Sequence, residues 1–124
     1  RTDMAEGLGT AGANTGLDAI AAAYTWVKLH TAAPGSAATS NAATETTRKQ
    51  VTWAAASGGS VANSAAVTWT NIAGSQDATH FSNWTASSAG TFGFSGTITA
   101  NAYTAGDTSD VAIGALTASF TLAS

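Results

Sequence analysis

The sequence predicts an all-β fold with one short helix near its N-terminus. Between Val51 and Phe94, large apolar residues recur two apart in four short runs. This spacing places their side chains on one face of a strand. Gly, Ser and Asn clusters separate the runs, as tight connections between strands require. We therefore expect seven or eight mainly antiparallel strands, arranged as a β-sandwich or a jelly-roll-like barrel.

The composition favours a single domain in a crowded setting. A chain of 124 residues is long enough to bury a core. The absence of cysteine excludes disulfides and thiolate metal sites. Only 9% of the residues are charged, against about 25% in an ordinary soluble domain. Such a neutral surface suits either a protein packed in an assembly or a secreted β domain rich in Thr and Ser.

The charges argue against nucleic acid as a partner. The net charge is −3, and only Arg48 and Lys49 are adjacent among the four basic residues. We expect no membrane partner either, because the longest apolar run, residues 19–23, is far shorter than the ~20 residues of a membrane span.

The first thirteen residues contain three glycines and no apolar periodicity. They are interpreted as an N-terminal arm, either flexible or ordered by a partner, and a frayed terminus is the alternative. Residues 14–124 are then one β-sandwich domain with an N-terminal helix.

Residues 15–24 carry the helical signal. Apolar residues fall at helical spacing: Leu17, Ile20, Ala21 and Tyr24. Thr15 and Asp18 form a plausible capping pair at its start. A helix this short needs packing to be stable, so we expect it to lie across an edge of the sheet.

The first strand is predicted over residues 24–30. Its alternation places Trp26 and Lys28 on one face and Val27 and Leu29 on the other. A Pro-Gly turn follows, and residues 32–47 then show no periodicity. A loop of this length in a small domain is uncommon unless it binds something, so it is a candidate interface segment.

The remaining strands follow at short intervals. They are predicted at residues 48–54, 61–64, 66–70, 78–84, 92–94 and 96–99, and in a last alternating stretch at 111–122. Gly93 and Gly96 lie inside a strand pattern, which indicates a bend or a close backbone approach. Residues 105–108 form the last marked turn.

No catalytic residue, cofactor or metal site is predicted. His30 and His80 are fifty residues apart and have no acidic or histidine neighbour two positions on. Asp77, Asp107 and Asp110 lie in or beside predicted turns, where aspartate commonly caps its own backbone. No serine lies in a Gly-x-Ser-x-Gly elbow. We expect that the protein is not an enzyme.

The tryptophans are the one constellation with functional potential: Trp26, Trp53, Trp69 and Trp84. They belong either to the core or a subunit interface, or to an aromatic platform on which sugar rings stack.

Five segments together resemble a family of small virion proteins of tailed bacteriophages, notably those of actinobacterial hosts. The segments are residues 26–35, 48–53, 63–69, 78–84 and 91–96, and the likeness extends from Trp26 to Leu122. Proteins of this family are described as minor tail, tail-fibre-like or head-decoration proteins. The resemblance implies a non-enzymatic structural protein of the virion, assembled in the cytoplasm of the bacterial host.

Within that family we expect a capsid decoration protein that cements the particle exterior. Such a protein would self-associate, with a trimer expected from closed symmetry, and bind the major capsid protein. The alternatives are a minor tail or tail-fibre-like protein bound to tail proteins, and a carbohydrate-binding adhesion module. The candidate interface residues are Leu8, Leu17, Ile20, Tyr24, Arg48 and Lys49.

Overall fold

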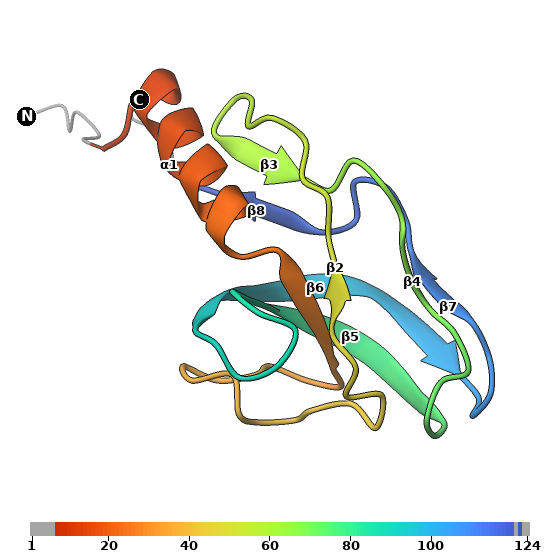
Figure 1. Cartoon of the computed structure of the whole chain (residues 1–124). Coiled ribbons are helices and arrows are strands. Elements are labelled where there is room, and N and C mark those ends of the chain that lie inside the picture. The colour runs from red at the N-terminus through yellow and green to blue at the C-terminus, as the bar shows by residue number, and fades with distance from the viewer. Residues whose placement is uncertain (1–6, 121, 123–124) are drawn as a thin grey trace, which may run out of the picture.

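The computed structural model describes residues 7–120 and 122 (Figure 1). In these residues one helix, α1 (Thr10–Ala23), precedes eight strands: β1 (Trp26–His30), β2 (Lys49–Gln50), β3 (Ser60–Ala62), β4 (Val67–Trp69), β5 (Gln76–Trp84), β6 (Phe92–Tyr103), β7 (Ser109–Val111) and β8 (Thr117–Ser119). All strand pairs are antiparallel. The predicted fold class is confirmed.

The strands form one larger sheet and two small ones. The four-stranded sheet has the order β2-β1-β5-β6, while β3 pairs with β8 and β4 with β7. In Figure 1 the β4–β7 pair lies along one side of the four-stranded sheet, and the β3–β8 pair lies beside α1. β6 is therefore an edge strand, and it is the longest of the strands in the described residues.

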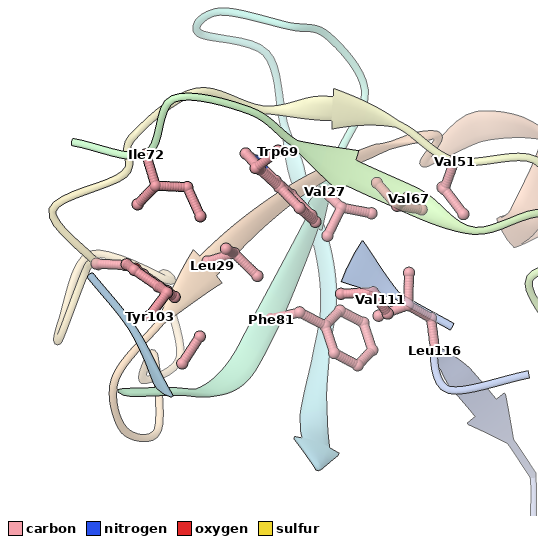
Figure 2. Close-up of a cluster of buried hydrophobic side chains, with 12 residues drawn as sticks. Val27, Leu29, Val51, Val67, Trp69, Ile72, Phe81, Tyr103, Val111 and Leu116 are labelled. Atoms are coloured by element: carbon pink, nitrogen blue, oxygen red, sulfur yellow. The ribbon is translucent and has the colours of Figure 1, made fainter. Parts of the chain in front are cut away.

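The main core lies between the four-stranded sheet and the β4–β7 pair (Figure 2). Val27, Leu29 and Phe81 point into it from β1 and β5, and Val67 and Trp69 point into it from β4. Val27 and Leu29 are buried while Trp26 and Lys28 are half-buried, which confirms the predicted faces of these residues. Each such side chain contributes roughly 1.5–3 kcal/mol by leaving water.

A second core cluster fixes α1 on β3. Leu17 and Ala21 pack against Val61 of β3. Two side chains of the helix also bind backbone amides of the segment before β3: Asn14 Oδ1 accepts from the Gly59 amide at 2.9 Å, and Asp18 Oδ1 accepts from the amide of residue 56 at 2.8 Å. Packing and these bonds hold a helix that is marginal on its own.

The helix begins earlier than predicted. It starts at Thr10 after an extended Gly9, so residues 10–13 belong to the helix and not to an arm. The proposed capping pair is wrong: the Thr15 hydroxyl lies inside the helix and donates to the Ala11 carbonyl at 3.0 Å, and Asp18 binds the segment before β3. The apolar signal was weak there because the buried residue of the first turn is Ala13. Residues 1–6 of the predicted arm lie outside the described residues.

Two predicted strands are shorter in the structure. The strand expected at residues 48–54 is reduced to β2, because the chain then leaves the four-stranded sheet for β3. The Val51 N–H still donates to Thr25 O, just before β1, whereas the Ala54 N–H donates to Ala62 O of β3. The last alternating stretch, predicted at 111–122, is not one strand: its first residue ends β7, residues 117–119 form β8, and the two strands pair with different partners. The two pieces predicted at 92–94 and 96–99 instead form one strand, β6.

Gly93 and Gly96 allow the close approach that the sequence indicated. A Cβ on Gly93 would overlap the ring of Tyr24, and one on Gly96 would lie 2.9 Å from Cε1 of Phe81. The pairing of β5 with β6 also shifts register next to Asn83, so the hairpin is irregular at this end.

The long loop after β1 packs on its own domain in part. Pro34, Ala38 and Ala43 are buried, and Ala43 N–H donates to Leu29 O at 3.1 Å. The loop therefore covers the end of β1, and the side chains that remain exposed keep the interface prediction open.

Candidate binding surface

The outer face of the four-stranded sheet carries a strip of aromatic side chains. Trp26 of β1 lies directly opposite Trp84 of β5. Phe92 of β6 pairs with Trp84, and their ring centroids are 5.6 Å apart. All three are half-buried. Trp26 and Trp84 lie on the face opposite to the core because side chains alternate along a strand, and the register shift next to Asn83 brings Phe92 of β6 beside Trp84 on that same face. We call Trp26, Trp84 and Phe92 the aromatic row.

Arg48 covers part of this row. Its guanidinium carbon lies 4.0 Å from the centroid of the Trp84 ring, a cation–π contact. Nη1 donates to the carbonyls of Ala86 at 2.9 Å and Ala89 at 2.7 Å, so the side chain fastens the loop between β5 and β6. Burial lowers the pKa of Arg48 from its usual value. Arg48 thus orders one rim of the row and occupies one face of Trp84.

A chain of hydrogen bonds runs beneath the row. The carbonyl of Ser40 only accepts, so the contact at 3.0 Å places the proton of His30 on Nδ1. In the neutral ring Nε2 then accepts from the Ser82 hydroxyl at 2.7 Å, and Ser82 Oγ in turn accepts from Trp84 Nε1 at 2.8 Å. Burial is the main cause that lowers the pKa of His30 and keeps it neutral. The ring of Trp84 is therefore oriented from below.

This serine–histidine pair has the spacing of a nucleophile and its base, but not the access. Both Ser82 and His30 have an exposed fraction of 0%. The second histidine nitrogen binds a backbone carbonyl and not a carboxylate. Since neither side chain is exposed, the pair packs inside the domain and links β1 to β5.

The two histidines are brought together by the fold. His30 and His80 are directly opposite on β1 and β5. His80 Nδ1 lies 2.8 Å from the Thr79 hydroxyl, which donates to Thr31 O. Within residues 7–120 and 122, no group of three or more His, Asp or Glu side chains is placed to hold a metal ion.

The predicted aromatic platform is divided between two environments. Trp69 has an exposed fraction of 0% and donates from Nε1 to Thr47 O at 2.7 Å, so it is a core residue and its assignment to a platform is wrong. Trp53 is half-buried, lies 5.9 Å from the Phe94 ring and donates to Tyr24 O. Only Trp26 and Trp84 share the outer face.

The predicted interface residues lie in different parts of the molecule and differ in exposure. Leu17 is 1% exposed and belongs to the second core cluster, so it is not available to a partner. Leu8 is 42% exposed, and Ile20 and Tyr24 are half-buried on the same helix side of the molecule. Arg48 and Lys49 lie at the opposite edge of the four-stranded sheet, in and beside β2.

Ile20 and Tyr24 line a groove of mixed apolar and hydroxyl side chains between α1, β6 and β8. Its volume is about 530 Å³, and its walls are residues 93–95 of β6 and 117–119 of β8. Phe94 and Phe120 complete the lining, and Tyr24 contacts the Phe94 ring edge-on at 6.5 Å. Phe120 is one of the exposed large apolar side chains of the described residues, at 37%.

Sequence reasoning missed three phenylalanines that build these surfaces. Phe92 belongs to the aromatic row, and Phe94 and Phe120 belong to the groove. Their alternation in the sequence gave a signal for strands. It gave no signal for the edge on which each strand lies, because that depends on pairing between distant segments.

One comparison with known proteins identifies the family. A family model described as "Podophage GP4 fiber I protein gp80" matches residues 11–119. The chain belongs to this fiber protein family. The match runs from the first turn of α1 to the end of β8, so it includes the aromatic row and nearly all of the groove. No curated protein matches the chain significantly.

Membership in the gp80 fiber family confirms the coarser expectation, a structural protein of a phage virion. The description of the matched family names a fiber and does not mention the capsid surface. In the part of the chain that the structure describes, no helix is long and apolar enough to cross a bilayer.

Proposed function

We propose that this chain is a non-enzymatic component of a virion fibre, attached to the tail of a phage. The observation that carries this proposal is the match of the gp80 fiber family over residues 11–119. It favours the tail-fibre-like alternative of the sequence analysis over capsid decoration, since nothing in the match speaks for the capsid.

The physical role of the chain in such a fibre is to form a rigid module. Two antiparallel layers share a core with Trp69, Phe81 and Leu116 at 0% exposure. Its surface has few charges, which lowers the repulsion between neighbouring subunits. The partners are other copies of the chain and tail proteins. The burial of Ser82 and His30 supports a role without catalysis.

Immunogold electron microscopy of intact virions tests the location. Antibodies raised against the purified chain should label the tail or its fibres. Mass spectrometry of separated head and tail fractions should find the chain with the tails. Label over the whole capsid surface would overturn the fibre proposal and restore the decoration hypothesis. Absence of the chain from purified virions would exclude both.

A second candidate function is carbohydrate binding by the aromatic row. The observation that favours it is the cross-strand pair of Trp26 and Trp84 on the outer face of the sheet. Flat aromatic faces match the apolar faces of sugar rings, and half-buried rings are partly accessible. The cation–π contact leaves Trp26 as the more available ring.

Tryptophan fluorescence during titration with surface polysaccharide of a host bacterium tests this function. A saturable change in the wild type that is lost in Trp26→Ala and retained in Trp53→Phe would support it. No saturable change in the wild type, or an equal loss in both variants, would exclude the row as a sugar site.

A further inference from the structure

We propose that two copies of this chain pair through the free edge of β6, antiparallel and about a two-fold axis at Gly96. The two four-stranded sheets would then form one continuous sheet. This inference goes beyond the proposed function, because it names the surface and the register of self-association.

The edge of β6 lacks the features that normally prevent strand pairing. β6 is twelve residues long, lies at the end of the strand order, and pairs only with β5 in the described chain. Its sequence, FGFSGTITANAY, contains no charged residue and no proline. Natural sheets protect exposed edges with short strands, charges or proline.

The opposite edge of the same sheet shows the usual protection. β2 has only two residues, one of which is Lys49, and Arg48 precedes it. At the β2 edge of the sheet, short length and positive charge thus oppose pairing with another strand, whereas the β6 edge has neither protection. This difference indicates that β6 is the edge at which a further strand pairs.

The second copy is the occupant that fits this edge best. A strand that pairs with itself about a two-fold axis satisfies the amides and carbonyls of both copies reciprocally. The chain carries a net charge of −3, but β6 itself is uncharged, so two copies meet there without like charges face to face. A second copy therefore suffices to pair with this edge, without a different protein as partner.

The alternation along β6 selects the register. Phe94 and Ile98 are half-buried and pack on the main core, while Ser95, Thr97 and Thr99 are exposed on the other face. A two-fold axis normal to the sheet keeps like faces together. With the axis at Gly96, Phe94 lies opposite Ile98 of the second copy and Ser95 lies opposite its Thr97. Aromatic with β-branched residues, and hydroxyl with hydroxyl residues, are favourable cross-strand pairs.

This register also fills the groove. Phe94 lines the groove together with Ile20, Tyr24 and Phe120. An Ile98 side chain of the second copy, placed opposite Phe94, would enter from the open edge and cover these residues. Apolar side chains of both copies would then pack together in the groove, and the two-fold symmetry would produce two such contacts in each dimer.

The oligomeric state of the full chain tests the proposal. Light scattering over a series from about 1 to 200 µM, the range that separates weak from moderate affinities, should show a rise from the chain mass to twice that mass. Thr97→Lys places a charge at the centre of the edge and should raise the dissociation constant at least about tenfold. Thr68→Lys, the same change at an exposed position of β4, is the matched control and should leave the constant unchanged.

Three outcomes would overturn the proposal: a monomer throughout the series, an assembly that is not a multiple of two, such as a trimer, or a dimer that Thr97→Lys does not weaken. Circular dichroism of each variant shows whether it remains folded. The location of the chain in the virion is measured independently, so failure of this dimer leaves the fibre assignment standing.

Disulfide trapping reads the register directly. The chain has no cysteine, so Ser95→Cys and Thr97→Cys each introduce a single thiol. The predicted pairing places these two positions opposite each other in different copies, within the range that a disulfide bridges. A mixture of the two variants should form several-fold more linked dimer than either variant alone. Equal yields in all three samples would contradict an axis at Gly96.

Discussion

His30 Nε2 lies 2.7 Å from Ser82 Oγ, and neither residue is exposed to solvent. Because the other nitrogen donates to the Ser40 carbonyl, Nε2 accepts from the Ser82 hydroxyl in the neutral ring, and protonation would turn Nε2 into a donor and reverse this bond. Two strands that are distant in the sequence are thus joined by a group whose protonation depends on pH.

The stability of the fold should fall in mild acid. Burial, assisted by the charges of Lys28 and His80, lowers the pKa of His30 below the 6.5 of an ordinary histidine. Below about pH 6.5 the unfolded chain binds a proton that the folded chain resists, so the free energy of unfolding decreases as the pH falls through the folded-state pKa. Urea unfolding between about pH 7.5 and 5 measures this decrease.

His30→Gln removes the titrating group and should flatten this dependence, although it lowers stability at neutral pH. His80→Gln is the control and should retain most of the decrease, because burial is the main cause of the shift at His30. If the decrease persisted in His30→Gln, another group would be responsible.

Gly93→Ala should destabilise the protein although Gly93 has no positive φ. Its added methyl group would overlap the Tyr24 ring. Overpacking of this kind typically costs about 1–3 kcal/mol. Gly9→Ala, where a Cβ would meet nothing within 4 Å, is the control. Thermal unfolding measures both. The double variant Gly93→Ala with Tyr24→Ala should lose less stability than the sum of the single changes, and strict additivity would contradict the contact.

Trp69→Ala should cost about 3–5 kcal/mol of unfolding free energy, since it leaves a cavity in the main core. Trp69→Phe keeps much of the volume but leaves Thr47 O without the indole donor, so a smaller loss of about 1–3 kcal/mol is expected. Denaturant unfolding measures both losses. If Trp69→Ala left the free energy of unfolding unchanged, Trp69 would not be a core residue.

Arg48→Lys should loosen the loop between β5 and β6 without unfolding the sheet. Lysine keeps the charge but has a compact ammonium group, which is a poor substitute for a planar guanidinium that stacks on a ring and bonds two carbonyls. Amide hydrogen exchange in residues 85–91 should become faster, while exchange in β1 stays the same. Lys49→Arg, a change in the reverse direction at the adjacent residue, is the control. Unchanged exchange in the loop would contradict the role of Arg48.

Local patterns in the sequence predicted much of the fold. The alternation in residues 26–29 identified both the strand and its buried face, and the glycines of β6 marked close contacts. The apolar spacing after Leu17 found the helix, but not its first residue, because Ala13 is small and gives little hydrophobic signal. The strand face and the helix depend on neighbours within a few residues, which is the range that periodicity reports. The partners of the two glycines, Tyr24 and Phe81, lie in distant segments and could not be predicted from that pattern.

The sequence by itself determined the fold class, the approximate positions of most strands and the resemblance to phage virion proteins. Only the tertiary structure decided which strands pair, and with that which of the four tryptophans is buried, that His30 meets Ser82, and that β6 is left at an edge. The physical reason is that strand pairing and burial arise from contacts between distant segments, some of them 52 or 53 positions apart. A two-residue period fixes the face of a side chain and contains no information about what lies opposite it.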